Sequence, residues 1–148
     1  MSADAAVRTR TFARVLGPLL VIIPAVVAAR AADMEALQAA FFENPALVWI
    51  TGAMLLSGGL VIIANHQFWS GPAPIMVSVL GWLFALRGVL LLAVPQLIEE
   101  VAEKMIGGAA IVRMGFAAEL LVGLWLTYAG WIARSPPPSH RTGSAGPR

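Results

Sequence analysis

The stretch that decides the fold runs from Gly59 to Pro95 and reads GLVIIANHQFWSGPAPIMVSVLGWLFALRGVLLLAVP. It holds the end of one long apolar segment, a short loop, and a second apolar segment that stops at a proline. An apolar segment of about 20 residues is long enough to cross the hydrocarbon core of a bilayer as a helix. The stretch therefore predicts two membrane helices joined by a tight turn.

The composition of the whole chain agrees with this prediction. Of its 148 residues, 59% are hydrophobic and only 12% are charged, and the mean hydropathy is +0.80. An average soluble domain carries about 25% charged residues. The length fits a single domain. Cysteine is absent, which excludes disulfides, thiolate-bound metals and a cysteine nucleophile. The composition predicts one integral membrane domain.

Hydropathy on either side of this stretch predicts an all-α, four-helix membrane bundle. We expect membrane spans at about residues 11–32, 46–64, 75–94 and 110–132. Two amphipathic segments, at about 33–44 and 96–106, are expected to lie as helices in the membrane surface. Residues 1–133 would form a single transmembrane domain. Residues 134–148 offer little apolar surface to bury and are expected to be a disordered cytoplasmic tail.

The two halves of this predicted bundle have the same order of elements: span, surface helix, span. A shift of about 64 residues places Leu16-Gly17 on Leu80-Gly81, and Gly59-Leu60 on Gly123-Leu124. Such self-similarity is typical of an internal duplication. Two separate hairpins that obey the same membrane constraints would give a similar pattern, so both interpretations stay open.

The first apolar segment also has two interpretations. Arg8, Arg10 and Arg14, the apolar run after them and Ala29-Arg30-Ala31 together imitate a secretory signal peptide that is cleaved after Ala31. The segment is equally long enough to span the membrane, and its prolines are tolerated in membrane helices. Because it matches the third span, we expect it to be retained.

The distribution of charge predicts the orientation. Arginines precede the first span and follow the last one, whereas acidic residues gather in the two longer loops. By the positive-inside rule, both termini are expected in the cytoplasm. The net charge of +2 is spread over two chain ends with no interleaved aromatic residues, which argues against a nucleic-acid partner.

Two charged residues are predicted at membrane depth, where an unpaired ion costs about 2.5–3.5 kcal/mol on insertion scales. Arg87 lies in the third span and Glu119 in the fourth, at matched distances from the same boundary. Antiparallel neighbours would bring them level, so we predict an intramembrane ion pair, with Arg113 as a rival partner. The pair would fix helix register; alternatively Glu119 would serve a proton or ion path, or the charges would meet another subunit or a lipid headgroup.

Two short motifs lie within the central stretch. His66 and Trp69 have the spacing H-x-x-W, and Gly81-Trp82 with Arg87-Gly88 has the spacing G-W-x4-[KR]-G. On these motifs the chain resembles a set of small uncharacterised bacterial inner-membrane proteins, strongly over about residues 45–95. In those proteins Asn often follows the histidine and Lys often occupies the position of Arg87. The resemblance implies a bacterial inner membrane and four helices, and it implies no activity.

These residues do not predict catalysis. The chain has two histidines, one of them in the tail, and it lacks a phosphate-binding loop, a metal motif or a paired acidic dyad. We expect no enzymatic activity, cofactor or metal. His66, Trp69, Gly81, Trp82 and Gly88 are interpreted as interface residues.

Two function classes stay open. The first is a structural or accessory subunit, or assembly partner, in the bacterial inner membrane. The alternative is a small oligomeric transporter or channel that uses the intramembrane Glu119. The expected partners are the lipid bilayer and another membrane protein or a second copy of the chain.

Overall fold

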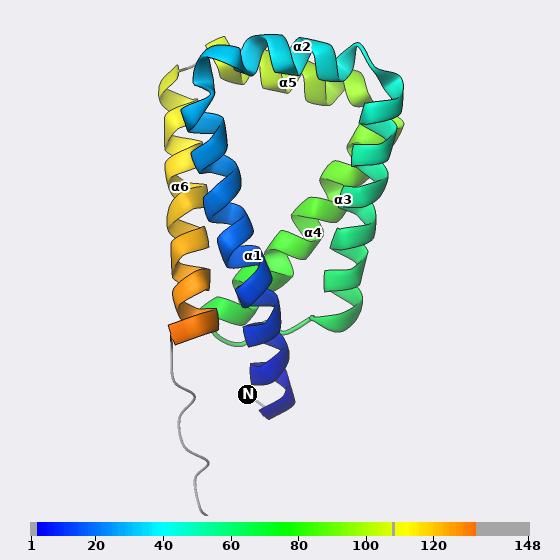
Figure 1. Cartoon of the computed structure of the whole chain (residues 1–148). Coiled ribbons are helices and arrows are strands. Elements are labelled where there is room, and N and C mark those ends of the chain that lie inside the picture. The colour runs from blue at the N-terminus through cyan, green and yellow to red at the C-terminus, as the bar shows by residue number, and fades with distance from the viewer. Residues whose placement is uncertain (1–2, 108, 133–148) are drawn as a thin grey trace, which may run out of the picture.

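Every element in the described part of the chain is helical, which confirms the predicted all-α fold. The computed structural model describes residues 3–107 and 109–132. In chain order its elements are α1 Ala3–Ala29, η1 Ala31–Asp33, α2 Met34–Phe42, α3 Pro45–Asn65, α4 Pro72–Ala93, α5 Pro95–Gly107, α6 Ala109–Thr127 and the π-helical turn η2 Tyr128–Ile132 (Figure 1).

Four of these helices are long and apolar enough to cross a membrane. The candidate spans are Asp4–Ala29, Pro45–Asn65, Pro72–Ala93 and Met114–Ile132, close to those predicted. The first helix starts at Ala3, well before the predicted boundary at residue 11, because alanine and arginine continue a helix beyond the apolar run. The predicted disordered tail, residues 134–148, lies outside the described residues.

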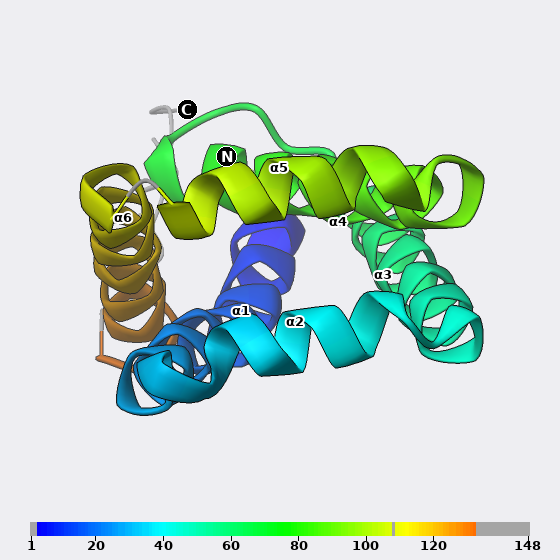
Figure 2. The same ribbon diagram turned by 90° about the horizontal axis from the view of Figure 1, so that it is seen from above.

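Both predicted surface helices are present, and they lie across the same end of the bundle. Figures 1 and 2 show α2 and α5 running side by side over that end. Local sequence explains where the neighbouring spans begin: Pro45 and Pro72 each open a helix at a position that needs no amide donor. Asn44 caps α3, because its side-chain oxygen accepts bonds from the amides of Ala46 and Leu47 at 3.1 and 3.3 Å.

The four spans pack as two pairs. Helix α1 packs along α6, and α3 packs along α4, whereas the pairs meet mainly where α1 contacts α4. Figure 1 shows α4 crossing the bundle diagonally behind α1, while α3 and α6 stand on opposite sides. The buried apolar cluster lies at this crossing and consists of Ala13, Leu16, Leu20, Ile62, Val77 and Leu126.

Glycines bring the backbones of α3 and α4 into contact. A Cβ atom at Gly59 would meet the backbone of Ala85, and one at Gly88 would meet the backbone of Leu56 and the Gly52 oxygen. Such small residues allow close helix packing in membranes. By contrast, a Cβ atom at Gly58 would meet nothing within 4 Å, so only part of the small-residue run in α3 forms the contact.

The helices of the two halves follow each other at similar intervals. Helix α1 ends at Ala29 and α4 ends at Ala93. Helix α3 begins at Pro45 and α6 begins at Ala109. Both pairs of positions are separated by the shift that aligns the two halves of the sequence. The first membrane-length helix of each half packs on the second membrane-length helix of the other half: α1 on α6, and α4 on α3. This order of elements matches a parallel repeat about an axis along the membrane normal and favours internal duplication.

Candidate functional site

A buried histidine joins three elements at one end of the bundle. His66 follows the last residue of α3, and its amide bonds to the Ile62 oxygen at 2.7 Å. The residue is only 1% exposed. Its Nε2 lies 2.8 Å from Thr9 Oγ1 on α1, and its Nδ1 lies 3.1 Å from Ser78 Oγ on α4. These three side chains, named here the histidine cluster, tie α1, α3 and α4 together.

The hydroxyl groups indicate how the protons of the histidine cluster are arranged. Thr9 Oγ1 donates to the Ala5 oxygen at 2.8 Å, and a hydroxyl has a single proton to give. Thr9 therefore accepts from His66 Nε2, which carries the ring proton. Ser78 Oγ has three neighbouring acceptors, His66 Nδ1 at 3.1 Å and the Phe68 and His66 oxygens at 3.2 and 3.4 Å, and when the ring is neutral its single proton goes to Nδ1, the nearest of the three. In this arrangement both nitrogens of the neutral imidazole are hydrogen-bonded.

The surroundings of His66 favour the neutral ring. Phe12 and Phe68 place their rings edge-on to the imidazole, with centroids 5.7 and 5.1 Å away. Burial lowers the pKa of His66 below its ordinary value of 6.5, and a hydrogen bond to its own backbone opposes this effect. A neutral, fully bonded imidazole positions helices and offers no free nitrogen for chemistry.

The other motif residues divide between a helix contact and the outer surface. Gly81 and Gly88 lie two turns apart on the face of α4 that meets α3, where a Cβ at Gly81 would come within 2.6 Å of Ile62. Trp69 and Trp82 are 54% and 53% exposed. Trp69 lies in the loop before α4, a position typical of interfacial tryptophan, whereas Trp82 lies near the middle of α4. Within the G-W-x4-R-G spacing, the two glycines therefore form the α3–α4 contact, while Trp82 and Arg87 are exposed.

Two arginines at the same end form a second site, which the sequence did not predict. Arg10 Nε and Arg14 Nε each donate to the Gly130 oxygen in η2 at 2.9 Å. The Arg14 guanidinium lies 5.5 Å from the Trp131 ring centroid, and the indole Nε1 donates to the Arg14 oxygen at 3.3 Å. We call Arg10, Arg14, Gly130 and Trp131 the arginine site.

The internal repeat contained a signal for the arginine site. The shift that superimposes the two halves of the sequence places His66 on Gly130, and Arg14 on Ser78. The contact between Arg14 and Gly130 therefore occupies the same place in one helix pair as the contact between Ser78 and His66 in the other. At equivalent places, the α3–α4 pair carries the buried His66 and Ser78, and the α1–α6 pair carries the exposed cation of Arg14.

The charges at membrane depth attract each other but do not touch. Arg87 is exposed on α4, and Glu119 is half-buried on α6. An electrostatic attraction acts between them, yet the ion pairs within 4.0 Å in the described part of the chain are Arg30–Asp33 and Lys104–Glu100. Each of these pairs lies within a single segment. The Arg113 side chain lies outside the described part.

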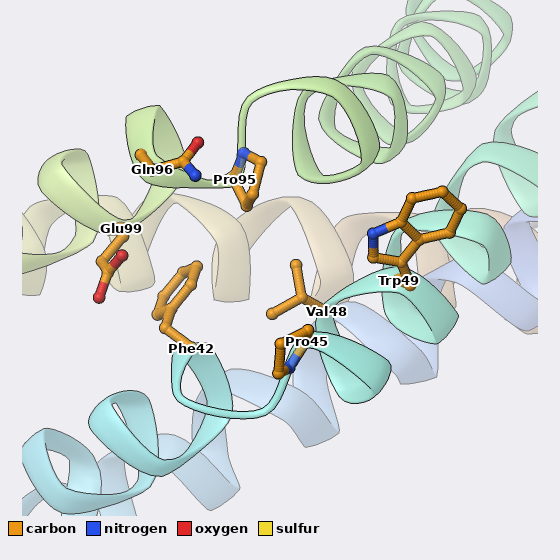
Figure 3. Close-up of a pocket in the computed structure, with 7 residues that line it drawn as sticks. All are labelled: Phe42, Pro45, Val48, Trp49, Pro95, Gln96 and Glu99. Carbon is orange, nitrogen blue, oxygen red and sulfur yellow. The ribbon is translucent and has the colours of Figure 1, made fainter.

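The surface helices border two depressions at the end of the bundle opposite the arginine site. A cavity of about 200 Å³ lies where α2 meets α3 and α4 meets α5, and Figure 3 shows its lining by Phe42, Pro45, Val48, Trp49, Pro95, Gln96 and Glu99. A groove of about 570 Å³ runs between α2 and α5 and carries Glu35, Glu43, Glu99 and Glu103. Among the described residues, no three acidic or histidine side chains are placed to hold a metal ion.

No family model, curated protein or solved structure matches this chain.

Proposed function

We propose that this chain is a structural or accessory membrane protein that assembles with another membrane protein or with a second copy of itself. The observation that carries this proposal is the state of Arg87. Its side chain is exposed on a membrane-length helix, and it forms no ion pair within 4.0 Å in the described part of the chain. A partner chain that offers a carboxylate would complete it.

The depth of Arg87 makes such a partner valuable. It lies six residues before Ala93, the last residue of α4, which is about 9 Å along a helix. A cation near the centre of the bilayer costs about 2.5–3.5 kcal/mol on insertion scales. Glu119 offsets part of this cost through its electrostatic attraction, but no direct contact completes the pair.

Several other polar side chains of the bundle have partners within the chain. His66 bonds to Thr9 and Ser78, and Arg14 bonds to Gly130. In the part of the chain that the structure describes, every buried side-chain nitrogen or oxygen atom has a hydrogen-bond partner. These groups hold the helices of one copy together, whereas Arg87 is available to another chain.

Purification in a mild detergent tests this proposal with a matched pair of variants. Arg87→Met removes the charge, and Leu86→Met alters the neighbouring exposed residue without changing charge. We expect the wild type and Leu86→Met to elute as a particle heavier than the 15.6 kDa chain, and Arg87→Met to lose that mass. Equal particle masses for all three proteins would contradict the proposal.

We further propose that the assembly lies in a bacterial inner membrane with both termini in the cytoplasm. The start of α1 and the end of η2 lie at the same end of the bundle (Figure 1), and the described residues there include Arg8, Arg10 and Arg14. Reporter fusions after Arg30, His66 and Lys104 should then read outside, inside, outside. An inside signal at Lys104 would reverse the assignment.

The alternative function, a small oligomeric transporter or channel, depends on Glu119. This carboxylate is half-buried and has no ion pair within 4.0 Å among the described residues, so it is a candidate for exchange of a proton or cation. Glu119→Gln should then abolish ion or proton flux in liposomes while leaving the fold intact. Absence of flux in the wild-type protein would remove this alternative.

A further inference from the structure

Arg87 and Glu119 carry opposite charges on one chain, and each lacks a direct ionic contact. Arg87 is exposed on α4, and Glu119 is half-buried on α6. They attract each other, but neither forms an ion pair within 4.0 Å among the described residues. Helix α4 runs diagonally, and its end near Arg87 lies on the α3 side of the bundle, away from α6 (Figure 1). A single copy therefore keeps the two charges apart.

The two charges lie at similar depth, and a symmetric dimer preserves that match. They are near enough to attract each other, so their depths differ little. Identical chains carry the same arginines before the first span and insert with the same orientation. Two such copies are related by a rotation about the membrane normal, which leaves every residue at its own depth. The Glu119 of a second copy is therefore at the right depth for Arg87 of the first, and the reverse also holds.

The outer face of α6 beside Glu119 has room for a close helix contact. Gly115 and Ala118 are exposed, and a Cβ at Gly115 would meet nothing within 4 Å. Small residues of this kind let a neighbouring membrane helix approach closely. By contrast, a Cβ at Gly123 would meet Leu20 of α1, so that glycine is already used inside the bundle. The open small residues thus lie beside the carboxylate that lacks a direct partner.

A second copy of the chain would complete both charges at once. We propose that the partner at Arg87 is a second copy of this chain, bound through two reciprocal ion pairs between Arg87 of one protomer and Glu119 of the other. Such an interface uses the same patch on both copies, and its four charges sum to zero. A different protein that offered only a carboxylate would leave Glu119 without a direct ionic contact. The inference rests on the proposed function, since it names the partner which that function requires.

Co-purification of two differently tagged copies from mild detergent tests the inference. Same-variant mixtures of Arg87→Met, or of Glu119→Gln, can form neither reciprocal pair, whereas a mixture of the two variants can form one. We expect wild-type copies to co-purify, both same-variant mixtures to lose this, and the mixed variants to co-purify better than either by about threefold or more, the factor of an average polar contact between membrane helices. Mixed variants that recover nothing would overturn the reciprocal pairs.

The wild-type result separates this inference from the proposed function. Wild-type copies that do not co-purify, in a particle heavier than the 15.6 kDa chain, would overturn the second copy and leave the proposed function intact. A wild-type protein mass of one chain would contradict both.

Disulfide trapping tests the interface without changing either charge, so it does not depend on the folding of the charge variants. The chain has no cysteine, and Leu86 and Ala118 are exposed neighbours of Arg87 and Glu119. Copies with Leu86→Cys and copies with Ala118→Cys, differently tagged, are oxidised in native membranes, and Met54→Cys replaces Ala118→Cys in the control. We expect a linked dimer with both tags from positions 86 and 118 and little from 86 and 54. No link between 86 and 118, or equal links in the control, would overturn the interface.

Discussion

Adding one methyl group at Gly59 should separate α3 from α4, whereas adding the same group at Gly58 should not. A Cβ at Gly59 would lie 2.8 Å from both the Ala85 Cα and the Gly81 oxygen, while ordinary contacts begin at 3.4 Å. Both neighbouring atoms belong to the backbone of α4, so the helices must move apart until these atoms reach an ordinary contact distance. A Cβ at Gly58 would meet nothing within 4 Å.

The magnitude of this effect follows from two opposing terms. Overpacking a close contact typically costs about 1–3 kcal/mol. Replacing glycine by alanine within a helix contributes up to about 1 kcal/mol of stability through backbone entropy. Because the two glycines are adjacent within α3, the entropy term nearly cancels between Gly59→Ala and Gly58→Ala. We therefore expect Gly59→Ala to be less stable than Gly58→Ala by about 1–3 kcal/mol.

Reversible unfolding in mixed micelles, followed by circular dichroism, measures this difference in free energy. Gly123→Ala and Gly115→Ala repeat the comparison in α6, where a Cβ at Gly123 would lie 2.8 Å from the Leu20 carbonyl carbon and one at Gly115 would meet nothing within 4 Å. Equal stabilities within both pairs of variants would refute the close backbone packing described above.

Three further predictions concern pH, the intramembrane charges and the first helix. Because burial lowers the pKa of His66 below 6.5, the unfolded chain binds this proton more readily, so the stability from the neutral ring is full above about pH 6.5 and declines below it, by at most about 1.4 kcal/mol per pH unit. Thermal unfolding of His66→Gln should show a flatter pH dependence, and an unchanged one would exclude this role. Since Arg87 and Glu119 attract each other, Arg87→Met and Glu119→Gln should each lower stability in detergent and the double variant should recover part of the loss; additive losses would show that the charges act separately. Intact mass should show that α1 is retained, because it packs along α6; a product that begins at Ala32 would contradict this.

Hydropathy was sufficient to predict the number and approximate limits of the helices, because membrane-length apolar runs have few alternative structures. Which helices pack against each other was harder to predict from the sequence. Glycine patterns mark close contacts without naming the partner, and Gly58 and Gly59 look equivalent in the sequence although only Gly59 meets another helix. Arg87 and Glu119 lie at similar distances from the same predicted membrane boundary, which suggested a contact between them. That comparison assumed that α4 and α6 run side by side, whereas Figure 1 shows α4 crossing the bundle diagonally.

The two polar sites were partly visible in the sequence. His66 was predicted as an interface residue, yet its partner Thr9 is 57 residues away and looks like any polar residue at a helix start. Arg10 and Arg14 were interpreted as topology signals because arginines before a first span usually are. Their bonds to Gly130 depend on the π-helical turn η2, which hydrophobic periodicity does not indicate.

Site-specific photocrosslinking tests the central claim, that a partner chain approaches Arg87, most directly. A photoreactive residue is placed at Leu86, beside Arg87, and as a control at Met54 on α3; these positions are 57% and 70% exposed. After irradiation of intact cells, we predict a discrete protein adduct from position 86, its loss when Arg87→Met is added, and no such adduct from position 54. Absence of a protein adduct at position 86, or an adduct that persists in Arg87→Met, would contradict the claim.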